Sequence, residues 1–190
     1  MNAVVRETDD YAYSEGYRLA GRIVADSVIQ RSMNSDFLVY PIVFLYRHNV
    51  ELQLKRLIPI GAFLVNQEIS EDDRKRLLEH SLNRLWALFE PILQKAAQRT
   101  LAITPEEIEG LRSYVNELNK FDPESFSGRY ALDRRGVPSI DKRMHPAINL
   151  GVLAECMERL TGYPFGLGEA FREAYQVKCQ MEDEARADAS

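Results

Sequence analysis

Residues that could form a disulfide framework or a zinc site are scarce in this sequence. It contains two cysteines and three histidines among 190 residues. Cys156 and Cys179 stand far apart without a pairing pattern, and the histidines have no zinc-ligand spacing. We therefore expect two buried or partly buried thiols in a reducing cytoplasm, with no disulfide, no metal and no other cofactor.

Long apolar runs and an excess of positive charge are also missing. The longest apolar run, FLVYPIVFLY, covers residues 37–46 and is too short to cross a bilayer. The first residues, MNAVVRETDD, lack the apolar core of a signal peptide. The net charge of -5 argues against an overall electrostatic attraction to nucleic acid. A chain with this net charge can still carry a local basic patch. We expect a cytoplasmic protein without membrane contact.

Glycine-rich nucleotide loops and nucleophile elbows are absent too. The glycines of GYPFGLG do not follow a strand pattern, as a Walker loop or a dinucleotide fingerprint requires, and no Gly-x-Ser-x-Gly is present. His48 and Glu51 lie on one helical face, but a di-iron bundle needs Glu-x-x-His on two helices and two further carboxylates. These absences argue against the common nucleotide-binding, hydrolase and di-iron classes.

Helical periodicity dominates what is present. The sequence predicts a single all-α domain over residues 1–190, a compact helical bundle with frayed termini at 1–12 and 183–190. Pro59 and Gly61 should kink or end the second helix, and Ser70 should cap a short one. The main helices are expected at about 14–30, 34–58, 80–93, 104–121, 146–160 and 167–184.

Two helix boundaries and one helix face can be stated in more detail. Thr104-Pro105-Glu106-Glu107 has the pattern of a capping box with proline at the first helical position. Asn34-Ser35-Asp36 supplies an N-cap for the second helix. In the first helix, Leu19, Ile23 and Val24 lie on one side, which we expect to be apolar.

One stretch has an extended pattern instead of a helical one. It is DPESFSGRYALDRRGVPSI, residues 122–140, and we expect one ordered loop or a small β-hairpin there. One interpretation is a loop that buttresses the bundle, with Arg129 paired to a carboxylate such as Glu51. The other is a basic rim that binds RNA phosphate. Its candidate residues are Arg129, Arg134, Arg135, Lys142 and Arg143.

The most apolar part of the chain carries four ionisable residues. In FLYRHNVELQLKRLI, residues 44–58, Arg47, Glu51 and Lys55 recur at every fourth position, and His48 lies beside them. On a helix these residues border the core side. They are either ion pairs at the edge of an amphipathic helix, or a half-buried polar cluster. In a half-buried cluster desolvation is costly unless each member is paired.

The opposite arc of the same helix should face water. Asn49, Gln53 and Arg56 share that arc, and we expect them to be exposed. The helix also has two apolar arcs, of which one suffices for the core. The second arc therefore favours a partner, and we expect a homodimer.

Three segments carry a family resemblance. PIVFLYRHNVELQLKRLI, HSLNRLW and DPESFSGRYALDRRG, in this order and spacing, resemble a bacterial all-helical family associated with the HEPN superfamily. The three segments cover residues 41–58, 80–86 and 122–136. The resemblance implies a compact helical bundle that dimerises. Many members of that superfamily are metal-independent ribonucleases of toxin–antitoxin, CRISPR and phage-defence systems, and others are catalytically dead.

The resemblance also implies candidate catalytic residues. The ribonucleases carry an Arg-polar motif followed shortly by His; the Arg holds the scissile phosphate and the His moves a proton. Arg47-His48 matches the opening, but residues 51–54 lack the second histidine. Arg74 with His80 is a looser match. Alternatively, Arg47 and His48 meet His80 in space, which makes these three the catalytic candidates.

Two functions remain in view. The preferred one is a HEPN-like interaction module, homodimeric or paired with a protein encoded nearby, in prokaryotic defence, stress or toxin–antitoxin systems. In it Arg47, Glu51, Lys55 and Arg129 form a buried structural network, and His48 is held between Glu51 and a second helix. The alternative is a metal-independent endoribonuclease that acts on RNA through the Arg/His site. The missing second histidine favours the module.

Overall fold

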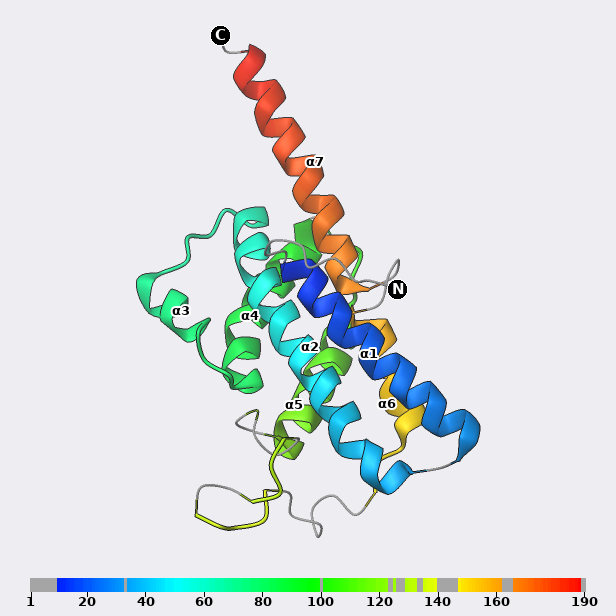
Figure 1. Ribbon diagram of the computed structural model, residues 1–190. Coiled ribbons are helices and arrows are strands. Elements are labelled where there is room, and N and C mark those ends of the chain that lie inside the picture. The colour runs from blue at the N-terminus through cyan, green and yellow to red at the C-terminus, as the bar shows by residue number, and fades with distance from the viewer. Residues whose placement is uncertain are drawn as a thin grey trace, which may run out of the picture.

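The structure is a computed structural model that describes most of the chain. Described are residues 10–32, 34–99, 101–122, 125, 129–132, 135–139, 147–161 and 166–188. Within them the chain forms seven α-helices packed into one bundle (Figure 1), which confirms the predicted all-α class. Leu132 and Pro138 form an isolated antiparallel bridge in the segment that was expected to be a loop or small hairpin.

Helix α2 (Ser35–Leu64) is the central element of the bundle. It packs against α1 (Asp10–Arg31), α4 (Leu82–Arg99) and α7 (Leu167–Asp188). Pro59 and Gly61 were expected to kink or end this helix; it does not end there, because it continues to Leu64. A proline removes one backbone hydrogen bond, and the buried residues on both sides of it keep the helix in place.

Small side chains allow α1 and α2 to pack closely. A Cβ on Gly21 would lie 2.9 Å from the ring of Tyr46, and Ala25 and Val28 are buried beside it. Glycine, alanine and valine thus form the buried side of α1 in its second half, while the polar residues Ser14 and Arg18 are buried in its first half. Leu19 and Ile23, which were expected to lie on one apolar side of this helix, are exposed.

The predicted helix starts agree with the structure at two positions. Helix α5 (Pro105–Phe121) begins with the capping box, in which Thr104 Oγ1 accepts from the Glu107 backbone and Glu107 accepts from the Thr104 backbone. Helix α3 (Glu71–Arg76) is capped by Ser70, whose side chain accepts from Asp73 N. Local hydrogen bonds alone determine these boundaries, so the sequence is sufficient to find them.

Other helix limits differ from the prediction. Asn34 precedes α2 in the left-handed conformation with φ 61°, and its side chain makes no capping hydrogen bond. Helix α6 (Leu150–Thr161) begins four residues later than expected, at 150 instead of 146. Helix α7 continues to Asp188 and extends beyond the bundle (Figure 1). Among the described residues, no helix is both long enough and apolar enough to cross a membrane.

Candidate functional site

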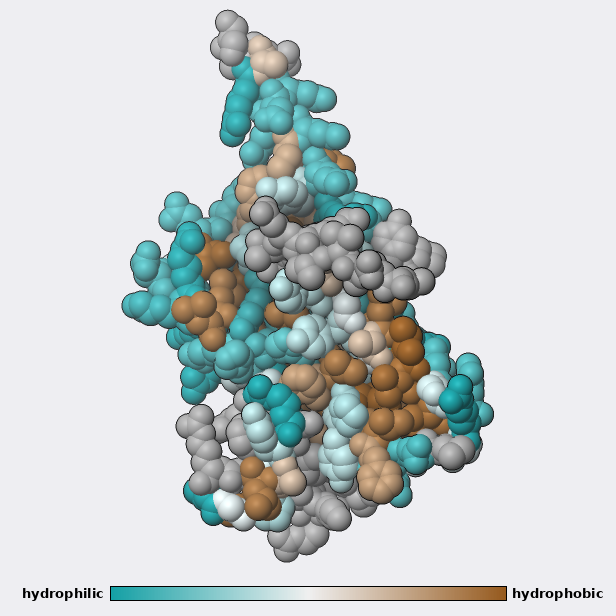
Figure 2. All heavy atoms as spheres, in the orientation of Figure 1, coloured by the Kyte–Doolittle hydropathy of each residue, from teal (hydrophilic) through white to brown (hydrophobic). Residues whose placement is uncertain are grey.

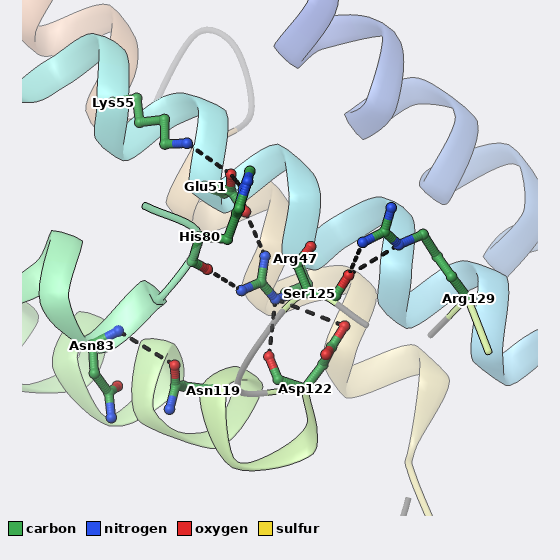
Figure 3. A network of polar contacts seen from close by, with 9 residues as sticks. All are labelled: Arg47, Glu51, Lys55, His80, Asn83, Asn119, Asp122, Ser125 and Arg129. Carbon is green, nitrogen blue, oxygen red and sulfur yellow. Dashed lines mark hydrogen bonds and ion pairs between the residues drawn. The ribbon is translucent and has the colours of Figure 1, made fainter. Parts of the chain in front are cut away.

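Arg47 lies in the interior of the bundle and connects three segments of the chain. Its side chain has no exposed surface. Nε donates to the carbonyl oxygen of Asp122 at 3.0 Å, and Nη1 donates to Glu51 Oε2 at 2.6 Å. Nη2 donates to the carbonyl oxygen of His80. Arg47 therefore joins α2 to the residue that ends α5 and to the segment that leads into α4 (Figure 3).

Glu51 is the acceptor at the centre of this network. Its side chain is 1% exposed, and its Oε1 accepts from Lys55 Nζ at 2.9 Å and from His80 Nδ1 at 2.8 Å. Burial by itself would raise the pKa of Glu51. The hydrogen bonds from Lys55, His80 and Arg47 outweigh that effect and hold the pKa below its usual range. The carboxylate is therefore ionised and fully paired.

The charged cluster within residues 44–58 is thus buried, and it is not a row of ion pairs on the exposed edge of an amphipathic helix. Arg47 and Glu51 are shielded from solvent, Lys55 is partly shielded, and the His80 ring is largely exposed. The four residues 47, 51, 55 and 80 form what we call the Glu51 network. Because each charge in it has a partner, the desolvation cost that burial imposes is offset.

Arg129 is not part of the Glu51 network, contrary to the expectation that it pairs with Glu51. Its Nε donates to the carbonyl oxygen of Ser125 at 2.9 Å, and its guanidinium lies over the Phe44 ring, 5.5 Å from the centroid. The loop therefore attaches to α2 through an aromatic ring. Arg135 is exposed, whereas Arg134, Lys142 and Arg143 lie outside the described residues.

His48 faces α1, away from the Glu51 network. Its ring packs edge-on against Tyr17, with centroids 4.4 Å apart, and stacks on Phe44 at 5.7 Å. The expected bond between His48 and Glu51 is absent from the described contacts, and His48 Nδ1 is buried without a described partner. Burial lowers the pKa of His48, although Glu51 opposes the shift. His48 and His80 thus occupy different sides of α2.

The arc of α2 that was expected to face water is instead covered by α1. Asn49 and Gln53 are buried, and only Arg56 on that arc is partly exposed. Asn49 Nδ2 donates to the carbonyl oxygen of Ser14 at 2.7 Å, and Gln53 contacts Ser14 Oγ at 3.3 Å. The prediction failed because a single helix carries no sign of which polar side a second helix will cover.

The geometry limits what the Glu51 network can do chemically. Each guanidinium nitrogen of Arg47 already donates to a protein oxygen, so a phosphate could reach Arg47 only by displacing these bonds. His80, unlike Arg47, is accessible: its Nδ1 contacts the buried Glu51, and the rest of the ring is largely exposed to solvent. Among the described residues, no group of three or more side chains is arranged to hold a metal ion.

An apolar surface lies over α1 and the start of α2. We define the α1–α2 face by Leu19, Ile23, Phe37 and Tyr40, of which Ile23 is 68% and Phe37 is 77% exposed. Figure 2 shows apolar side chains gathered over the middle of α1 and the adjoining part of α2. Leu19 and Ile23 were the sequence signal for this face. Periodicity identified them as an apolar stripe without showing that it points outward.

Comparison of the chain with protein-family models, with curated proteins and with solved structures found no match.

Proposed function

We propose that this protein is a non-catalytic helical interaction module that functions as a homodimer through the α1–α2 face. The observation that carries the proposal is the exposure of large apolar side chains on two adjacent helices, which an isolated chain would leave in water. Fully burying one such side chain contributes about 1.5–3 kcal/mol. Contiguous apolar surface rimmed by polar residues is typical of protein interaction sites.

The composition of the α1–α2 face favours a second copy of the same chain. None of its four defining residues is charged at neutral pH, and the cores of homodimer interfaces are likewise depleted of charge and enriched in aromatic residues. In a two-fold dimer the same patch meets itself, so an uncharged patch encounters no like-charge repulsion. A strongly charged partner would find no complementary charge among these residues.

The Glu51 network has a structural role in this proposal. Arg47 and Glu51 connect α2 with the ends of two neighbouring segments, and a buried pair of this kind fixes their relative position. Arg47 is fully engaged, and His48 packs against aromatic rings instead of facing a substrate. We therefore expect no metal-free RNA cleavage in EDTA. Cleavage by wild type that His48→Ala or His80→Ala abolishes would contradict the non-catalytic role.

The sequence resemblance supplies the cellular setting of the proposal. Similarity to HEPN-associated proteins leads us to propose a cytoplasmic function in prokaryotic defence, stress or toxin–antitoxin systems, with a protein partner encoded nearby. We also propose that the basic loop contacts RNA. Of the five candidate residues, the structure describes Arg129 and Arg135. A pull-down with the neighbouring gene products tests the partner directly.

Surface substitution tests the dimer. Ile23→Asp places a charge at the centre of the α1–α2 face and should convert a dimer into a folded monomer. The matched control is Leu78→Asp, because Leu78 is 78% exposed but lies beyond α3, away from that face. Sedimentation velocity with circular dichroism reports both mass and fold. An unchanged sedimentation coefficient in Ile23→Asp, or equal dissociation in both variants, would exclude this face as the interface.

A further inference from the structure

His80 combines an exposed ring with a buried anchor. Its side chain is 65% exposed, yet Nδ1 lies 2.8 Å from Oε1 of Glu51, which is 1% exposed. An ionised carboxylate can only accept hydrogen bonds, so Nδ1 carries the proton. In the neutral ring, Nε2 then keeps its lone pair. The tautomer and the orientation of His80 are therefore both set by Glu51 (Figure 3).

The backbone of His80 is fixed as well. Arg47 donates to the carbonyl oxygen of His80, and α4 begins two residues later, at Leu82. A cation lies nearby, because Lys55 Nζ and His80 Nδ1 contact the same oxygen of Glu51. An oriented imidazole beside an ammonium group is an arrangement suited to nucleophilic attack on an anionic group.

We propose that Nε2 of His80 is a nucleophile that accepts a phosphoryl group from a small phosphoramidate donor. The Nε2 lone pair forms the new P–N bond, the P–N bond of the donor breaks, and the protonated donor nitrogen leaves as neutral ammonia. Nothing is oxidised or reduced. The reaction goes beyond the interaction function, and it does not depend on a dimer.

The Glu51 network favours both the attack and the product. Attack at Nε2 leaves the ring as an imidazolium that still donates from Nδ1, so Glu51 keeps its hydrogen bond and gains a positive partner. The new phosphoryl group is anionic, and the ring that carries it shares the Oε1 atom of Glu51 with the ammonium group of Lys55. His48 has no such arrangement, because its ring is packed between Tyr17 and Phe44.

Phosphorylation by potassium phosphoramidate at neutral pH tests the proposal. The rate at His80, followed by intact mass and located by tandem mass spectrometry, is compared with that of N-acetylhistidine in the same solution. We expect His80 to react about tenfold faster than the free imidazole. His80→Gln should remove this fast phosphorylation and leave at most the slow rate of a free imidazole, and His48→Gln should leave the fast rate unchanged.

Two further variants separate a positioning role from a structural one. Glu51→Gln should slow the reaction at His80, and circular dichroism shows whether this variant still folds. Lys55→Met leaves Glu51 with its bonds from Arg47 and His80, and it should also slow the reaction. The proposal is overturned if His80 reacts no faster than N-acetylhistidine, if another histidine takes the label as fast as His80, or if Lys55→Met reacts at the wild-type rate.

Discussion

The guanidinium of Arg47 and the carboxylate of Glu51 form an ion pair of 2.6 Å, one helical turn apart, with neither side chain exposed to solvent by more than 1%. Most ion pairs at this spacing lie on helix surfaces and contribute little. Here both charges have left water, so the stability of the fold depends on their staying paired. Lys55 and His80 complete the set of donors to Glu51.

Removal of the Glu51 carboxylate should therefore be strongly destabilising. Glu51→Ala removes the carboxylate that accepts directly from Arg47, and it leaves the buried guanidinium only the more distant Asp122 Oδ2, 3.8 Å from Nε. We expect a loss of about 3–5 kcal/mol in the free energy of unfolding. The control is Asp72→Ala, which breaks the exposed pair between Asp72 and Lys75 and should cost at most about 1 kcal/mol. Denaturant melts measure both. A loss below about 1 kcal/mol in Glu51→Ala would show that the pair is solvated.

Acid should weaken the protein through the same residue. The pKa of Glu51 in the fold is below its ordinary value of 4.5, so the unfolded chain binds protons first as the pH falls. Its stabilising contribution is complete above pH 4.5 and is lost as the pH falls through the folded pKa. The unfolding free energy of wild type should thus drop more steeply below pH 4.5 than that of Glu51→Gln. Parallel pH profiles would refute this assignment.

His48 should destabilise the fold in a different pH range. Burial lowers its pKa from the ordinary value of 6.5, so protons bind the unfolded chain more readily. Stability from the neutral ring is present above pH 6.5 and declines as the pH falls from there toward the folded pKa. Proton NMR of the ring should give a midpoint below 6.5, and His48→Gln should remove this part of the pH dependence. A midpoint above 6.5 would contradict the buried placement.

The contact between α1 and α2 should not tolerate a larger residue at Gly21. In Gly21→Ala the new methyl group would lie 2.9 Å from the Tyr46 ring, which is buried and cannot move away freely. We expect a loss of about 1–3 kcal/mol. Gly110→Ala in α5 is the matched control, since nothing lies within 4 Å of its Cβ, and it should stabilise by about 0.5–1 kcal/mol. Thermal melts measure both variants. Equal changes in melting temperature for Gly21→Ala and Gly110→Ala would argue against close packing at Gly21.

Local signals in the sequence were sufficient for part of this structure. The capping box at Thr104 and the cap at Ser70 depend on residues three positions apart, so they could be read directly. The all-helical class followed from periodicity in the same way. The four-residue spacing of Arg47 and Glu51 also predicted their contact.

Tertiary partners could not be derived from the sequence. Glu51 meets His80, which is 29 residues away, and no local pattern joins the two. Asn49 and Gln53 look like surface residues until α1 covers them, because the amides find their partner in Ser14. Likewise, Ile23 lies on the side of α1 that was predicted to be apolar, yet it is exposed, because the smaller Ala25 and Val28 take the inner position. These errors share one cause, which is that helix packing decides which face of an amphipathic helix is inside.

The oligomeric state of the wild-type chain tests the central claim most directly. Multi-angle light scattering across a dilution series from tens of micromolar to about one micromolar gives the mass without reference to shape. The proposed homodimer through the α1–α2 face predicts a mass of twice 21.8 kDa at the micromolar end. A mass of 21.8 kDa at every concentration in the series would contradict the account.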